Sequence, residues 1–193
     1  MKEKIANIIN ESIQIKKELL SKTQIDKILE VVNIITNSIK NGGKLILFGN
    51  GGSAADSQHI AGELVGRFQK ERRGIAALAL TTNTSNLTAI ANDYGFELTF
   101  ARQIEAIGKK GDVVIGISTS GKAHNVIAAV IKAKEMEIKT VALTGGDGGE
   151  LAELTDISII IPSKRTPRIQ EAHITIGHII CELVEEELFG NDK

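Results

Sequence analysis

The stretch that decides the fold is Lys44–Phe68, KLILFGNGGSAADSQHIAGELVGRF. Its apolar start, Leu45 to Phe48, predicts a buried strand. The glycine-rich segment Gly49–Gly52 lets the backbone turn sharply or approach a ligand, and Ser53 fits the N-cap of a helix that starts at Ala54. A strand, a glycine turn and a helix N-terminus in this order form a typical site for an anion.

His59 and Glu63 are candidate chemical groups on that helix, because residues four apart share one helical face. The alternative is a solvated pair on an open surface. Small residues at Ala55, Gly62 and Gly66 indicate a helix that packs closely against its neighbours. A titratable pair on a packed helix beside an anion site favours a chemical role.

Composition excludes several classes of protein. The 193 residues suit one domain, and a formal net charge of −1 gives no electrostatic basis for binding nucleic acid or an anionic membrane. Aromatic residues make up only 3% of the chain, which leaves few stacking platforms for single strands. Cys181 lies in an apolar helical run and fits a buried thiol. Without a signal peptide or a membrane-spanning apolar run, we expect a cytoplasmic protein.

Two amphipathic helices are expected before the first strand, at Lys4–Leu20 and Ile25–Ile39, and Asn41–Gly43 ends the second. Their apolar faces must cover either the sheet of the same chain or a second subunit. We expect a helix hairpin, partly buried in a homo-oligomer, with residues 1–43 as the oligomerisation segment.

Strands and helices alternate along the rest of the chain, which predicts an α/β fold with a parallel sheet covered on both sides. After the first strand we expect strands at Ile75–Leu80, Asp112–Ile117, Thr140–Leu143 and Ile157–Ile161, and helices at Leu87–Asn92, Phe96–Ile107, Lys122–Glu137, a short stretch ending at Leu154, and Arg168–Leu188, with a turn at Asn92–Gly95. Ligands of such sheets bind beyond the carboxyl ends of the strands.

Two nucleotide-binding motifs match only in part. Gly49-x-Gly51-x-x-Ala54 fits the dinucleotide fingerprint, but the second strand ends at Leu80–Asn83 without the acidic residue that this motif needs about 20 positions further on. The segment GISTSGKA is close to a P-loop, but Ala123 has no hydroxyl for the magnesium of a nucleotide. Neither motif therefore supports nucleotide binding.

Ser118, Thr119 and Ser120 instead favour one sugar phosphate. Hydroxyls donate hydrogen bonds to phosphate oxygens, and the N-terminus of the following helix is partially positive. The alternative is plain N-capping of that helix. One cap needs one hydroxyl, and three in a row exceed that need.

The closing helix carries further candidates. Gln170 and His178 are eight residues apart and lie within about 80° of each other around the helix axis. A buried His178 needs a partner, which Glu63 or a metal could supply. His173 points well away from His178, and we expect a surface or interface histidine there.

Together these motifs identify a family. The segments FGNGGSAADSQHIAGELVGRF, ANDYGFE, GISTSGKAHNV and RIQEAHITIGHIICELVE resemble phosphoheptose isomerases over essentially the whole chain. On its own, the serine loop marks only the broader class of sugar isomerase (SIS) domains. The resemblance implies conversion of sedoheptulose 7-phosphate to D-glycero-D-manno-heptose 7-phosphate, the first step of ADP-heptose synthesis, a precursor of lipopolysaccharide.

The resemblance also implies an architecture and a site. It implies a single SIS domain over residues 1–193, with a five-stranded parallel sheet, in a homotetramer whose active sites lie between subunits. It implies one zinc per subunit, held by His59, Glu63, Gln170 and His178. It implies substrate contacts from Asn50, Gly51, Gly52, Ser53, Glu63, Asn92, Asp93, Ser118, Thr119, Ser120 and Gln170.

Two positions depart from the family pattern. Ala123 replaces a serine that some members use on the phosphate, so that contact is missing or moved to Lys122 or His124. Pro167 stands where some members have an aspartate near the substrate. A non-catalytic relative, the DnaA initiator-associating protein, lacks the counterparts of Glu63 and His178, whereas this chain has both.

An aldose–ketose isomerase must move a proton between adjacent carbons through an enediol, with a base at one carbon and an acid at the carbonyl oxygen. Glu63 is the candidate base and His178 the candidate acid. A carboxylate on zinc is a weaker base, so either Glu63 leaves the metal during turnover or the metal is mainly organisational. The rival hypotheses are a SIS module that binds a sugar phosphate or a protein without turnover, and an isomerase of another ketose phosphate.

Overall fold

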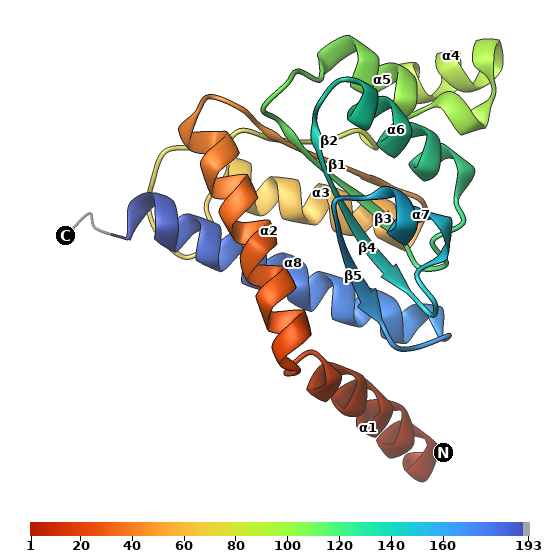
Figure 1. Ribbon diagram of the computed structural model, residues 1–193. Coiled ribbons are helices and arrows are strands. Elements are labelled where there is room, and N and C mark those ends of the chain that lie inside the picture. The colour runs from red at the N-terminus through yellow and green to blue at the C-terminus, as the bar shows by residue number, and fades with distance from the viewer. Residues whose placement is uncertain (191–193) are drawn as a thin grey trace.

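The computed structural model describes residues 1–190 and contains one five-stranded parallel sheet at its centre (Figure 1). The strands lie in the order β2-β1-β3-β4-β5, and Leu47 of β1, for example, pairs with Ala79 of β2 and Ile115 of β3. The strands are β1 (Leu45–Gly49), β2 (Ala77–Ala79), β3 (Val113–Ser118), β4 (Lys139–Gly145) and β5 (Ile157–Ile161). This confirms the expected α/β fold and parallel sheet.

Helices cover both faces of the sheet. They are α1 (Lys2–Glu18), α2 (Lys22–Lys40), α3 (Gly52–Val65), α4 (Thr84–Tyr94), the 3-10 turn η1 (Phe96–Leu98), α5 (Ala101–Ile107), α6 (His124–Glu135), α7 (Gly149–Leu154) and α8 (Thr166–Phe189). Successive side chains of β1 point to opposite faces of the sheet, so the hydrophobic core has two parts. Leu45 and Leu47 pack with α2, α3 and α8, while Ile46 and Phe48 pack with α5, α6 and α7. No helix within residues 1–190 is long and apolar enough to cross a membrane.

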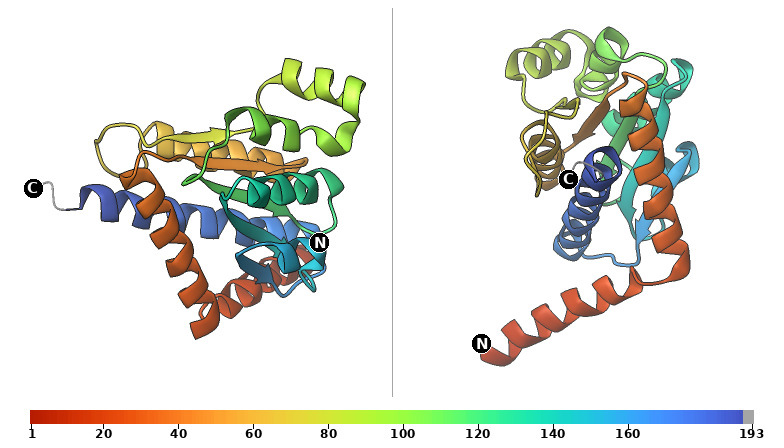
Figure 2. Two further views of the ribbon diagram at one scale, coloured as in Figure 1. Left: turned by 45° about the horizontal axis from the view of Figure 1, so that its top comes forward. Right: turned by 90° about the vertical axis from the view of Figure 1, so that its left-hand side faces the viewer.

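The N-terminal helices form the expected pair ahead of the first strand. α2 lies across α8 and β5, whereas α1 runs out beyond the sheet and contacts α8 (Figure 2). Arg168 of α8 fixes α1 through its Nη1, which donates to the carbonyl oxygen of Ile8 at 2.9 Å. Large apolar side chains stay exposed along this pair: Ile5, Ile9, Ile13, Leu20, Ile25 and Leu29.

Several element boundaries differ from those expected. α4 begins at Thr84 rather than Leu87, because the Asn83 side chain accepts a hydrogen bond from the Asn86 N–H and caps the helix earlier. The expected turn at Asn92–Gly95 is instead the last turn of α4, which ends at Gly95 with φ 93°. The helix expected over Phe96–Ile107 is divided at Thr99 and Phe100 into η1 and α5.

Candidate functional site

A cavity of about 360 Å³ opens at the carboxyl ends of β1 and β3. β1 and β3 are neighbours in the sheet, and the connections that follow these two strands run to opposite sides. Ligands of open α/β sheets bind at such a point. The cavity is lined by Asn50, Gly51, Gly52, Ser53, Ile117, Ser118, Thr119, Ser120, Ala123, Thr166 and Gln170. The glycine turn and the hydroxyl loop therefore share one cavity.

The glycine turn shapes one wall of this cavity. Gly51 has φ 55° and ψ −120°, which suits glycine alone, and the helix begins one residue later. The expected N-cap at Ser53 is therefore wrong, since Ser53 lies inside the first turn of α3 and is only 3% exposed. A Cβ at Gly52 would lie 2.3 Å from Nε2 of Gln170, so only glycine leaves room for that amide.

The hydroxyl loop forms the opposite wall. α6 begins at His124, and its N-cap is Ala123, whose side chain has no capping group. Plain N-capping therefore does not account for the three hydroxyls of Ser118, Thr119 and Ser120. The oxygen of Ser120 accepts a hydrogen bond from the N–H of Lys122 at 3.2 Å, which orders the loop locally.

Asn50 is held by a residue that the sequence analysis did not identify. Nδ2 of Asn50 donates to Oδ1 of Asn125 at 2.8 Å, and Nδ2 of Asn125 donates back to Oδ1 of Asn50 at 2.9 Å. Asn125 lies buried in the first turn of α6. This amide pair joins the loop that follows β1 to the helix start that follows β3. In the sequence, the position of Asn125 soon after the hydroxyl loop is the signal that could have identified it.

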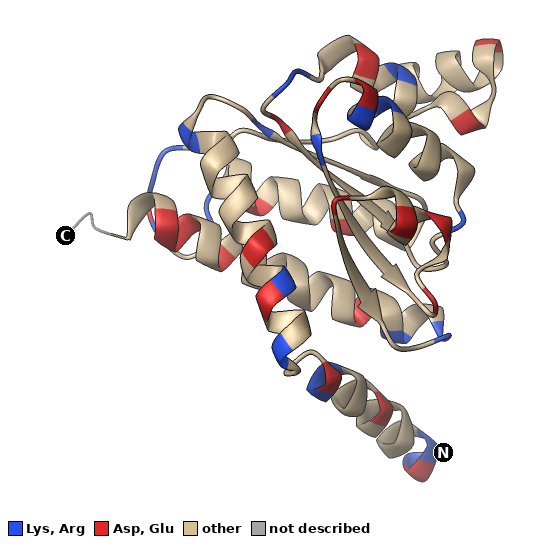
Figure 3. Cartoon of the chain, viewed as in Figure 1, with Lys and Arg blue, Asp and Glu red and all other residues tan. Residues whose placement is uncertain are grey.

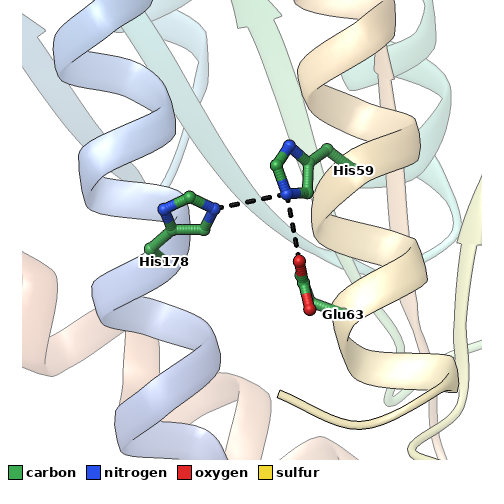
Figure 4. Close-up of side chains that lie close together, drawn as sticks. All are labelled: His59, Glu63 and His178. Carbon is green, nitrogen blue, oxygen red and sulfur yellow. Dashed lines mark hydrogen bonds and ion pairs between the residues drawn. The ribbon is translucent and has the colours of Figure 1, made fainter. Parts of the chain in front are cut away.

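A second cluster lies farther along α3 and α8, outside the lining of the cavity. Nε2 of His59 and Oε1 of Glu63 are 3.0 Å apart, and Nε2 of His178 is 3.4 Å from Nε2 of His59 (Figure 4). One ligand atom from each residue lies within 4.8 Å of the other two. The Phe68 ring packs against His178, with 5.7 Å between ring centroids. The helical spacing of His59 and Glu63 thus aims both side chains at the facing helix.

The donor set of this cluster fits a zinc ion. Two imidazole nitrogens and a carboxylate oxygen are common zinc ligands, and tetrahedral bonds of about 2.0–2.1 Å place ligand atoms roughly 3.3 Å apart. The observed separations of 3.0 and 3.4 Å are close to this value. Gln170 lies two turns before His178 on α8, and its amide packs over Gly52.

Asn92 and Asp93 are not brought to either cluster within this chain. Both are exposed on α4, at the far side of the sheet from α8 (Figure 1). Nδ2 of Asn92 donates to Oδ1 of Asp93 at 2.8 Å. The contact of these residues with a sugar remains a prediction.

The expectation for His173 is wrong, because this histidine is fully buried against β4. Its Nε2 lies 3.1 Å from the carbonyl oxygen of Thr144. Burial lowers the pKa of His173 from 6.5 to about 4, and the hydrogen bond to Thr144 opposes this only in part. Ile169, Ala172 and Ile176 have the spacing of a sheet-facing stripe, and that stripe could have placed His173 correctly.

Comparisons with known proteins agree with this arrangement. The model of the SIS domain family matches residues 9–145. The chain is 53% identical to phosphoheptose isomerase of Aquifex aeolicus, over 96% of this chain and 97% of that protein. The structure of phosphoheptose isomerase GmhA from Neisseria gonorrhoeae is 43% identical and superimposes with a TM-score of 0.90, covering 96% of this chain and 98% of that one. A phosphoheptose isomerase structure from Francisella tularensis gives 36% identity and a TM-score of 0.91, over 95% and 97%.

The sheet order, the cavity at its switch point and the family match define a sugar isomerase (SIS) domain protein. Within this class the identity is high and extends over nearly the full length of both chains. The chain therefore belongs to the phosphoheptose isomerase family. The resemblance stated from sequence motifs is confirmed.

Proposed function

We propose that this protein isomerises sedoheptulose 7-phosphate to D-glycero-D-manno-heptose 7-phosphate, the step that begins ADP-heptose synthesis. The observation that carries the proposal is the convergence of Glu63 and His178, in a chain 53% identical to a phosphoheptose isomerase. A SIS module without turnover has no need for a carboxylate and two imidazoles gathered on facing helices.

The cavity at β1 and β3 binds the phosphate of the substrate. Ser53, Ser118, Thr119 and Ser120 supply hydroxyls, and the N-terminus of α6 adds a favourable partial charge. Asn50, Gly51, Gly52 and Gln170 line the same cavity and contact the sugar between its phosphate and the cluster of His59, Glu63 and His178. Binding at the phosphate fixes the position of carbons that lie far from it.

Proton transfer takes place at the second cluster. Glu63 removes a proton from C1 of the opened ketose, and the electron pair forms the C1–C2 double bond of the enediol. His178 donates a proton to the C2 oxygen. Return of a proton to C2 and loss of the proton from the C1 oxygen then give the aldose. No atom is gained or lost.

The same cluster is the proposed metal site, with His59, Glu63 and His178 as ligands and Gln170 as the fourth. Glu63 and His178 act as base and acid only when they are off the metal, because a metal-bound carboxylate is a weaker base and a metal-bound imidazole nitrogen carries no proton. A bound zinc ion would supply Lewis-acid polarisation of the substrate oxygens. Support comes from the ligand spacing and from the chemistry of the donor set.

The proposed assembly is a cytoplasmic homotetramer in which residues 1–43 form subunit contacts. The exposed residues Leu20, Ile25 and Leu29 support this, because they border an apolar cavity of about 360 Å³ between α1, α2 and α8. Assembly would also give Asn92 and Asp93 of a neighbouring subunit access to the site.

Product analysis across ketose phosphates of different chain length tests the function. Purified protein is incubated with sedoheptulose 7-phosphate and with six-carbon and five-carbon ketose phosphates, and new aldoses are identified by NMR. We expect an aldose from the seven-carbon substrate at the highest kcat/KM. Binding of the heptulose without any aldose would instead support a sensor, and preference for a shorter ketose would identify a different isomerase.

A further inference from the structure

A buried ion pair joins the ends of the two helices that carry the His59, Glu63 and His178 cluster. Arg72 lies in the segment 66–76 that follows α3, and Glu185 lies near the end of α8. Nε of Arg72 is 2.6 Å from Oε2 of Glu185, and the two side chains are 1% and 2% exposed.

The Glu185 carboxylate organises the segment after α3. Its oxygens accept hydrogen bonds from the backbone N–H groups of Phe68, Gln69 and Lys70 at 2.7–3.0 Å, in addition to the Arg72 guanidinium. Burial alone would raise the pKa of Glu185, but these four donors outweigh it and hold the pKa below its usual value. The carboxylate is therefore ionised at neutral pH and binds the segment tightly.

The Arg72 guanidinium caps the C-terminus of α3. Nη1 donates to the carbonyl oxygens of Leu64 and Gly66 at 2.9 and 3.2 Å, and Nη2 donates to that of Glu63 at 3.1 Å. The last carbonyls of a helix have no partner within the helix, and here one side chain provides it. The backbone of Glu63 itself is thus tied to Arg72.

Glu185, at the other end of the ion pair, is connected to His178. Residues seven apart on a helix lie only about 20° apart around its axis, so Glu185 and His178 face α3 together. Phe68, whose N–H is bound by Glu185, places its ring against His178. One continuous set of contacts therefore connects the backbone of Glu63 with the ring of His178.

We propose that Arg72 and Glu185 are positioning residues that set the separation of α3 and α8, and thereby the geometry of the His59, Glu63 and His178 cluster. A buried ion pair alone often gives no more stability than apolar residues of similar volume. Here the two charged side chains also bind backbone N–H groups of the segment 66–76 and the last carbonyls of α3, which an apolar pair could not do. A geometric role explains why charges occupy this position. The inference rests on the proposed function, because it assigns the pair a role in the metal and proton-transfer site.

The test measures metal affinity. The loss of a purely structural ion pair would lower stability without selectively weakening metal binding. Co²⁺ is titrated into metal-free wild type and into the double variant Arg72→Met/Glu185→Gln, which leaves no unpaired buried charge. We expect the double variant to bind Co²⁺ at least about tenfold more weakly, the usual effect of losing an outer contact of a metal site, with altered d–d bands. Inhibition by inorganic phosphate should stay unchanged, because the phosphate cavity is separate.

Asp112→Asn is the matched control. Asp112 is also a buried carboxylate in an ion pair, and it accepts hydrogen bonds from Lys44 and from the backbone of Lys109 at the other end of the sheet. This variant should lose stability but keep wild-type Co²⁺ affinity. Equal Co²⁺ affinity in the double variant and Asp112→Asn would overturn the inference.

A second variant keeps the test decisive if the double variant does not fold. Phe68→Ala leaves the ion pair intact and removes the ring that packs against His178 and against the edge of the core. We expect it to fold and to bind Co²⁺ several-fold more weakly, whereas wild-type affinity would count against the bridge. A wild type that turns over sedoheptulose 7-phosphate but binds no Co²⁺ would remove the metal site and this inference, leaving the isomerase activity standing.

Discussion

Individual side chains divide the candidate site into the proposed phosphate-binding part and the proposed proton-transfer part. Ser120 belongs to the first part, and its hydroxyl lines the cavity beside Ser118 and Thr119. Glu63 and His178 belong to the second and lie on facing helices. Substitutions in the two parts should therefore change different kinetic constants.

Ser120→Ala should raise KM more than it lowers kcat. The lost hydroxyl contacts the phosphate equally in the ground state and the transition state, so uniform binding is reduced. Steady-state kinetics with sedoheptulose 7-phosphate measures this. An unchanged KM would remove Ser120 from the phosphate site.

His173 should make the protein lose stability as the pH falls. Its pKa is lowered from 6.5 to about 4 in the folded state, so between these values the unfolded chain binds the extra proton and the folded chain does not. The contribution of His173 to the free energy of unfolding is complete above pH 6.5. It falls by up to about 3 kcal/mol on acidification to pH 4. Urea unfolding at several pH values measures the slope, which His173→Gln should reduce. An equal slope in that variant would show that His173 is not the cause.

Helix α3 combines both parts of the site, since its first turn borders the phosphate cavity and its middle carries His59 and Glu63. Because α3 and α8 pack along their length, a change at one end can reach the other. At Gly52 this packing leaves no room for a side chain, because the Gln170 amide lies directly against it.

Gly52→Ala should lower kcat/KM at least about tenfold with little loss of stability. The new methyl group would displace Gln170, whose flexible side chain can move without disturbing the core. Gly62→Ala is the control on the same helix, because a Cβ there meets nothing within 4 Å. It should keep activity and gain up to about 1 kcal/mol from better helix propensity. Equal kcat/KM in both variants would contradict the proposed role of Gln170.

For the molecule as a whole, charged residues are spread over the helices, α1 and α2 included (Figure 3), but α1, α2 and the link between them also expose large apolar side chains. Leu20 is 72% exposed and Leu29 is 51% exposed. Exposed apolar surface of this kind marks an interaction site. A site shared between subunits would also explain why the exposed residues Asn92 and Asp93 reach nothing within one chain.

Leu29→Glu should therefore reduce the size of the oligomer. A carboxylate in an apolar interface is costly to desolvate and has no partner there. Light scattering after size-exclusion chromatography measures the mass, with Glu30→Gln as a control on the same helix. A variant that keeps the wild-type mass would exclude this surface from the interface.

The sequence predicted the sheet, its order of strands and helices, and the residues of both clusters, because buried parallel strands and glycine turns leave local patterns. It did not predict contacts that depend on distant packing. The Arg72–Glu185 bridge joins segments far apart in the chain, and no local pattern records it. The Asn50–Asn125 pair joins distant segments as well, and only the position of Asn125 just after the hydroxyl loop pointed to it. The error at His173 came from considering that residue alone, because its place in the stripe of Ile169, Ala172 and Ile176 indicates burial.

The most direct test of the whole account is the activity of Glu63→Gln on sedoheptulose 7-phosphate, followed by NMR of the aldose product. Glutamine keeps the shape of the side chain but cannot accept the C1 proton. We predict a kcat about a hundred- to ten-thousandfold below wild type, with the oligomer and its inhibition by inorganic phosphate unchanged. A kcat near that of the wild type would contradict the assignment of Glu63 as the base.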